Sequence, residues 1–132
     1  MRWQRVVSIG AILFLAGFLL GFIPERRRAS LLDEQRKAAQ LQKRLSDIRE
    51  LALLSYFQAS RLNYGSARDA SERMFGLARQ LANGTEDRNL KSSLDALQTM
   101  HDPLKAKLTA ADASVLQPLQ QLVQKTQSEL TR

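Results

Sequence analysis

Residues 25–64 read ERRRASLLDEQRKAAQLQKRLSDIRELALLSYFQASRLNY and contain neither proline nor glycine. Leu, Ala, Arg, Gln, Glu and Lys dominate this stretch, and all six are strong helix formers. Pro24, just before it, is expected to end or kink any helix that precedes it. Asn63, Tyr64 and Gly65 supply turn chemistry at the other end. The sequence therefore predicts one long helix between these two points.

An apolar seam with alternating three- and four-residue spacing follows this stretch, which is typical of coiled coils and helical bundles. All of its ten positions except Glu34 and Ser55 are apolar: Leu31, Glu34, Ala38, Leu41, Leu45, Ile48, Ala52, Ser55, Ala59 and Leu62. From Leu51 onward the apolar surface widens to LALLSYF, which is more than a two-stranded seam requires. We therefore expect a coiled-coil-like stalk over residues 25–50 and an antiparallel helical bundle over residues 51–132.

Capping signals predict where the second helix of the bundle begins and ends. Ser66, with Asp69 three residues later, has the spacing of a capping box. Asn83 and Gly84 form a C-cap pair. The inward face of this helix is expected to hold Ala67, Ala70, Met74, Leu77, Ala78 and Leu81.

Two more helices are expected after residue 84. Thr85 is predicted to cap the first, whose apolar spacing continues through Pro103 and favours a single kinked helix. The alternative is a new helix capped by Asp102 with Pro103 in its first turn. Asp112 is predicted to cap the last helix, with Pro118 bending it or delaying its start. No segment shows the alternation of a β-strand, so the fold class is all-α.

The N-terminal part contains an uncharged run at residues 6–23, VVSIGAILFLAGFLLGFI. Eighteen helical residues span roughly 27 Å, close to the hydrocarbon thickness of a bilayer. Trp3 lies beside the run, where an interfacial aromatic residue is common, and arginines flank both ends. We expect residues 1–24 to be a short N-terminal tail and a transmembrane anchor. The alternative is a cleaved signal peptide, but PERRR rather than a small-residue cleavage site follows the run.

The formal net charge of +7 is concentrated beside this run. Residues 25–44 hold seven basic and three acidic side chains, or +4, whereas residues 45–132 hold eleven and ten, or +1. A nearly neutral folded domain argues against nucleic acid as a partner. The positive-inside rule favours an inner-membrane protein with a cytoplasmic C-terminal domain, and the arginines of the N-terminal tail favour the periplasmic alternative.

Two groups of residues near the membrane are candidate sites. Gly10, Gly17 and Gly21 have spacings that allow close helix packing in a bilayer. Counting on from Gly10 and Gly17 in steps of seven residues leads to Leu31, Ala38 and Leu45. This register predicts a parallel homodimer or higher oligomer, unless the seam is covered within its own chain. Arg26, Arg27 and Arg28 could attract anionic lipid headgroups or only set the membrane topology.

Aromatic residues and the one histidine are the remaining candidates. Tyr56, Phe57, Tyr64 and Phe75 lie within twenty residues, so we expect them to meet near one helical hairpin. There they form either part of the core or an anchor patch for a protein partner. His101 falls on an apolar seam, where an ordinary partly buried side chain is the simplest reading.

The sequence indicates no catalytic, cofactor-binding or metal-binding residues. The chain has no cysteine, and neither a nucleophile motif nor a paired-histidine spacing is present. The function expected is that of a non-enzymatic, membrane-anchored scaffold or adaptor that self-associates and binds an unknown protein partner. The alternatives are a membrane-associated signalling or sensor module and an accessory subunit of a transport or envelope-assembly complex.

Overall fold

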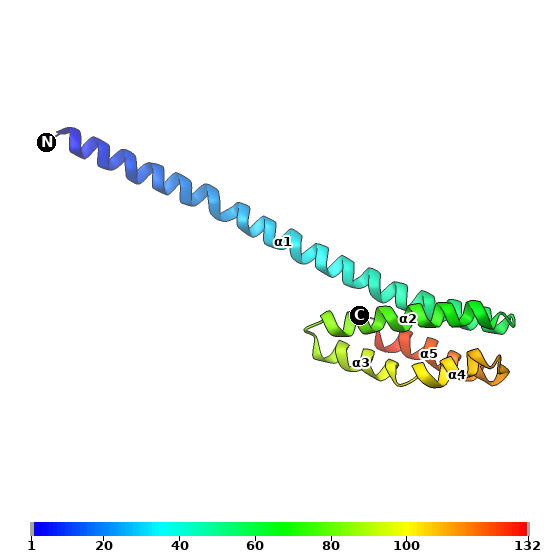
Figure 1. The fold of residues 1–132 in the computed structure, drawn as a ribbon. Helices are drawn as coiled ribbons and strands as arrows, with labels where there is room; N and C mark the ends of the chain where they lie inside the picture. The colour runs from blue at the N-terminus through cyan, green and yellow to red at the C-terminus, as the bar shows by residue number, and fades with distance from the viewer. Residues whose placement is uncertain (1, 132) are drawn as a thin grey trace. The chain divides into compact units, whose positions relative to one another are not determined.

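The computed structural model describes the backbone of residues 2–131 and the side chains of residues 14, 16, 17 and 26–131. Over this part the regular elements are all helical, which confirms the all-α prediction (Figure 1). They are α1 (Arg2–Ser60), α2 (Tyr64–Gly84), α3 (Arg88–Gln98), α4 (His101–Thr109), the 3₁₀ turn η1 (Ala113–Val115) and α5 (Leu116–Glu129). The chain divides into two compact units, residues 1–40 and residues 41–132.

Unit 1 consists of the first part of α1. The helix does not end at Pro24, contrary to one of the two sequence expectations for this residue, because the proline removes a single N–H donor and strong helix formers follow it. Side chains 26–40 are exposed. Among the described residues, no helix is both long enough and apolar enough to cross a membrane. The side chains of the expected span at 6–23 lie outside the described set, except for Phe14, Ala16 and Gly17.

Unit 2 is an antiparallel helical bundle. The last part of α1 lies beside α2, which runs back in the opposite direction (Figure 1). Helix α2 packs against both α3 and α4, α3 contacts α5, and η1 bridges α4 and α5. Structurally, unit 2 begins at Leu41, and a separate stalk over residues 25–50 stays a prediction.

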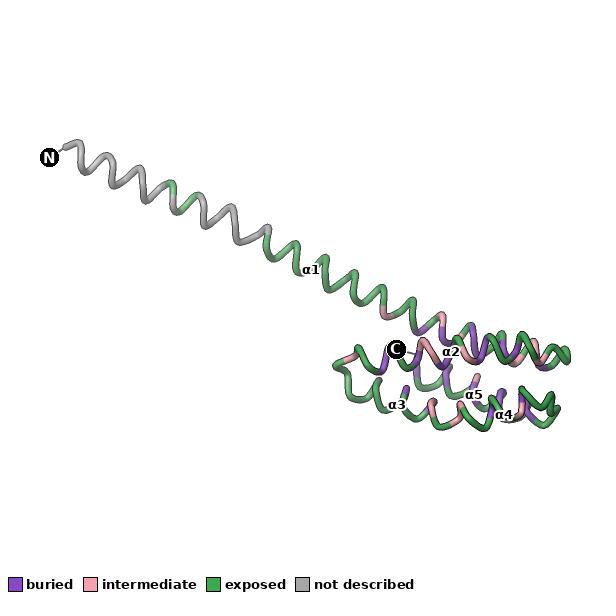
Figure 2. The backbone as a smooth tube through the Cα atoms, viewed as in Figure 1, coloured by how far each residue is buried: buried purple, intermediate pink, exposed green. Residues whose placement is uncertain are grey.

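The core of unit 2 is built from the helix faces that the apolar spacing predicts (Figure 2). On α1 the seam residues from Leu45 to Ala59 are buried, and on α2 only Leu77 of the predicted face is half-buried rather than buried. Leucines fill the other side of the bundle: Leu90, Leu94, Leu97, Leu104, Leu108, Leu119, Leu122 and Leu130. The seam of α1 from Leu45 is therefore covered within its own chain.

Small side chains are prominent among the buried residues of α1 and α2. Ala52 and Ala59 on α1, and Ala67 and Ala78 on α2, are fully buried. Ser55, also buried, donates a hydrogen bond from Oγ to the carbonyl oxygen of Ala67 at 2.8 Å. A side-chain hydrogen bond to the neighbouring backbone requires the two helices to approach closely, and small residues permit that approach.

The connection between α1 and α2 differs from the predicted turn. Its left-handed residue is Leu62, with φ of 62°, and Gly65 already lies inside α2. The N–H of Asn63 donates to the Gln58 carbonyl at 2.9 Å, and that of Leu62 donates to Ala59 at 3.0 Å, which is the Schellman pattern. Asn63, rather than Ser66, caps α2, because its side chain accepts from the N–H of Ser66.

The segment after α2 contains two helices, α3 and α4, in place of the single kinked helix favoured by the sequence. Thr99 and Met100 interrupt the helix, and Pro103 is the third residue of α4, where its missing N–H would have no partner inside the helix. The N-cap of α3 is Asp87, which accepts from the N–H groups of Asn89 and Leu90. The predicted cap, Thr85, instead accepts from the N–H of Asp87.

The last connection follows the prediction more closely. Asp112 accepts from the N–H of Ser114 at 2.9 Å and begins η1, which leads directly into α5. Helix α4 ends in a second Schellman pattern around Ala111, whose φ is 50°. Pro118 is the third residue of α5 and is accommodated in the first turn.

Candidate protein-interaction surface

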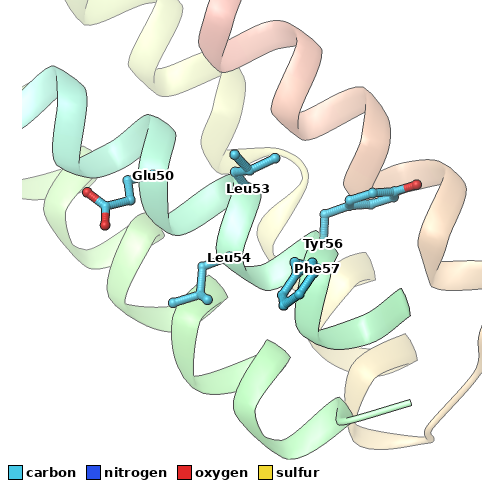
Figure 3. A pocket seen from close by; sticks show the side chains of 5 residues that line it. All are labelled: Glu50, Leu53, Leu54, Tyr56 and Phe57. Atoms are coloured by element: carbon cyan, nitrogen blue, oxygen red, sulfur yellow. The ribbon is translucent and has the colours of Figure 1, made fainter. Parts of the chain in front are cut away.

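An open, mainly apolar groove of about 410 Å³ lies on α1 and is lined by Glu50, Leu53, Leu54, Tyr56 and Phe57 (Figure 3). Leu53, Leu54 and Phe57 are 50%, 39% and 49% exposed, respectively. We call these three residues the outer face of α1. They lie away from the buried seam formed by Ala52, Ser55 and Ala59, so the bundle's own packing leaves them uncovered.

Helical periodicity explains this exposure. Glu50, Leu54, Phe57 and Arg61 are spaced by four, three and four residues, so they follow one stripe along the helix surface. The seam residues occupy the opposite stripe, which α2 and the rest of the bundle cover. At the end of the exposed stripe, the guanidinium carbon of Arg61 lies 4.9 Å from the centre of the Phe57 ring. This cation–π contact steadies the ring at the surface.

The four predicted aromatic residues have different environments. Phe75 is buried in the core, where its ring meets the imidazole of His101 edge-on with a centroid distance of 5.0 Å. Tyr56 and Tyr64 are half-buried and pack against the core. Phe57 lies on the surface, and Tyr56 and Phe57 line the groove together. Thus the structure brings two of the four residues into the candidate surface and assigns Phe75 to the core.

His101 belongs to a polar cluster between α2 and α4. Its Nε2 lies 3.1 Å from Glu72 Oε2, and its Nδ1 lies 2.9 Å from Asp102 Oδ1. The ammonium of Lys105 lies 3.2 Å from the other Glu72 oxygen, Oε1. The His101 hydrogen bond is the main cause of a lowered Glu72 pKa; partial burial opposes that shift, and Lys105 supports it. This arrangement joins two helices of the bundle.

The other predicted sites lie in unit 1. Gly17 is exposed, and a Cβ added there would meet nothing within 4 Å, whereas Gly10 and Gly21 lie outside the described side chains. Arg26, Arg27 and Arg28 are exposed. Among the described residues, no group of three histidine, cysteine or acidic side chains could hold a metal ion.

Sequence reasoning did not select Leu53 and Leu54 as site residues. Both belong to the widened apolar stretch LALLSYF, whose width predicts packing against other helices of the same chain. The available signal was their position beside, not on, the three- and four-residue seam. An apolar residue opposite a complete seam has no partner in its own chain and is a candidate for an intermolecular contact.

Comparison with protein families, curated proteins and solved structures finds no match to this chain. The chemistry available at the surface is that of helix docking. Leucine and phenylalanine side chains offer apolar area, while Glu50 and Arg61 at the two ends offer opposite charges that can set the direction of an incoming helix.

Proposed function

We propose that the chain is a non-enzymatic, membrane-anchored scaffold or adaptor that presents a helical bundle for protein binding. The observation that carries this proposal is the outer face of α1, where Leu53, Leu54 and Phe57 remain exposed although the opposite side of the helix is packed in the core. Exposed apolar patches with polar borders are typical of protein-interaction sites.

Membrane attachment is the second part of the proposal and is supported by the sequence. Residues 6–23 are uncharged, and arginines border them on both sides. The exposed Arg26, Arg27 and Arg28 would lie next to the headgroups of such an anchor. On the positive-inside argument, the bundle lies on the cytoplasmic side of the inner membrane.

Membrane extraction tests the anchor. The full chain is expected in the membrane fraction after alkaline carbonate washing. A Leu15→Arg/Leu19→Arg variant should shift to the soluble fraction or fail to insert, because an arginine in the middle of an apolar span costs about 3 kcal/mol. The matched control, Leu15→Ile/Leu19→Ile, should behave as the original chain. Recovery of the unmodified chain in the wash would contradict the anchor.

Topology is tested separately with reporters fused after Arg132 and with labelling of Ser92→Cys. Ser92 is exposed on α3, and the chain has no other cysteine, so labelling there reports one site. We expect the introduced cysteine to react with an impermeant reagent only after the cells have been lysed. Labelling of intact cells by an impermeant reagent would place the bundle on the periplasmic side.

A sensor function is the second candidate. The groove volume of about 410 Å³ lies within the range of small-molecule sites, and its lining is mainly apolar. Ligand-induced stabilisation of the bundle would favour this reading over that of a scaffold. An apolar probe such as a naphthalene sulfonate would test this function. Tight binding of the probe to the original chain, and loss of that binding in Phe57→Ser, would support a ligand site.

A further inference from the structure

The outer face of α1 has a charge pattern that matches itself in reverse. Glu50 lies four residues before Leu54, and Arg61 lies four residues after Phe57. A two-fold axis passing between Leu54 and Phe57 therefore places Glu50 of one copy opposite Arg61 of a second, twice in the same interface. It also places Leu54 of each copy opposite Phe57 of the other. This is the arrangement required of an isologous contact, in which both subunits use the same surface.

We infer that the outer face of α1 docks antiparallel against the same face of a second copy, with Leu54 packing on Phe57 and Glu50 pairing with Arg61. The inference rests on the protein-binding part of the proposed function and identifies one partner of the interaction surface as the chain itself. Because α1 is one helix from Arg2 to Ser60 and the paired copies run in opposite directions, their N-terminal runs are directed oppositely, so the contact joins copies anchored in two opposed bilayers rather than in one. Charge complementarity indicates that the partner covering this face is a second copy of the chain. In a parallel pair, Glu50 would face Glu50 and Arg61 would face Arg61, and both like-charge contacts disfavour association.

The same structure argues against continuing the predicted parallel seam into the bundle. That seam ran from Gly10 and Gly17 through Leu31 and Ala38 to Leu45, and Leu45 is 1% exposed in the core of its own chain. It cannot also pack on a second copy without unfolding the bundle. The apolar residues of α1 that remain available in unit 2 are those of the outer face.

The first test measures self-association of the full chain in mild detergent by energy transfer between donor- and acceptor-labelled copies. Leu54→Ser/Phe57→Ser should weaken association by about tenfold or more, because it removes the apolar centre of the interface. The matched control is Leu31→Ser/Leu32→Ser, which replaces two exposed leucines of the same helix outside the face. Both sets are exposed, so the helical circular dichroism of each variant should stay unchanged.

Two results would overturn the inference at this stage. One is an original chain that stays monomeric throughout the micromolar range. The other is a control pair that weakens association as much as the outer-face pair does. Since association in detergent needs no bilayer, these results are independent of whether residues 6–23 anchor the chain.

The second test fixes the direction of pairing. The chain contains no cysteine, so single introduced cysteines report one position each. Copies carrying Glu50→Cys, mixed with copies carrying Arg61→Cys, should form a mixed disulfide-linked dimer on oxidation, while Glu50→Cys alone should not. Efficient crosslinking of Glu50→Cys copies with one another would show parallel pairing and overturn the antiparallel arrangement.

A charge exchange provides a check that uses no crosslink. Glu50→Arg should weaken association because it places two arginines opposite each other at both ends of the interface. The double variant Glu50→Arg/Arg61→Glu restores opposite charges only if position 50 faces position 61 of the second copy. Recovery of association in the double variant is the expected result, and its absence would contradict the proposed register.

Discussion

The Nε2 atom of His101 lies 3.1 Å from Oε2 of Glu72, so a side chain near the start of α4 is joined to the middle of α2. The imidazole also packs edge-on against Phe75, one helical turn from Glu72 on the same helix. The only histidine of the chain is therefore an interhelical connection, which agrees with its position on an apolar seam.

Acid should weaken this connection. The His101 hydrogen bond holds the pKa of Glu72 below its ordinary value of 4.5, so the folded state binds the Glu72 proton less readily than the unfolded chain does. The resulting stability is present above pH 4.5 and is lost as the pH falls through the lower, folded-state pKa. Urea denaturation at several pH values should show a smaller loss over this window in Glu72→Gln than in the original chain. Equal losses in both would contradict this role of Glu72.

Ser55→Ala should cost about 1 kcal/mol of unfolding free energy, because it removes the buried hydrogen bond to the Ala67 carbonyl. Ser60→Ala is the matched control, since the Ser60 hydroxyl bonds to the Phe57 carbonyl of its own helix at an exposed position. The control should change stability by less than about 0.5 kcal/mol. Thermal unfolding of the two variants side by side distinguishes them, and an equal effect would argue against the α1–α2 bond.

Leu62→Gly should stabilise the protein by about 0.5–1 kcal/mol. Leu62 has a φ of 62°, a region in which a side chain is strained, and it is 72% exposed, so little packing is lost. Ala111→Gly should act in the same direction at the second left-handed position. The opposite substitution, Gly76→Ala, should also stabilise, because Gly76 lies inside α2 with open space at its Cβ. Calorimetric melting temperatures would check all three, and a decrease for Leu62→Gly would refute the strain argument.

Asp87→Ala should destabilise α3 by about 1 kcal/mol, since two first-turn N–H groups lose their acceptor. Thr85→Ala should cost less, because Thr85 accepts only from the N–H of Asp87, outside the helix. Amide hydrogen exchange of residues 88–91 is the appropriate measurement. Faster exchange of these amides in Thr85→Ala than in Asp87→Ala would show that Thr85, the cap predicted from the sequence, is the N-cap of α3.

Most of the bundle could be predicted because its helices bury one regular face each. The spacing of Leu45, Ile48 and Ala52, and that of Ala67, Ala70 and Met74, follows the helical period and marks the buried side. Helix ends at Gly84 and near Asp112 were also indicated by local chemistry.

The remaining features could not be predicted, for identifiable physical reasons. The break at Thr99 and Met100 keeps Leu97 and Leu104 in the same core, so the apolar spacing gives no sign of it. Leu62 adopts a conformation that usually selects glycine, so its own identity misplaces the turn. The outer face could not be assigned with the seam alone, because spacing shows that Leu53 and Leu54 lie off the seam but not whether another helix of the same chain covers that side.

The buried alanines of α1 and α2 are expected to tolerate substitution less well than the buried leucines of the bundle. Ala52, Ala59, Ala67 and Ala78 have no exposed surface, so a larger side chain at any of them has to displace packed neighbours. On the opposite side, one leucine can be exchanged for methionine or isoleucine with modest repacking. Random mutagenesis of this chain should therefore leave the alanine positions nearly invariant among folded survivors, while the leucine positions diversify.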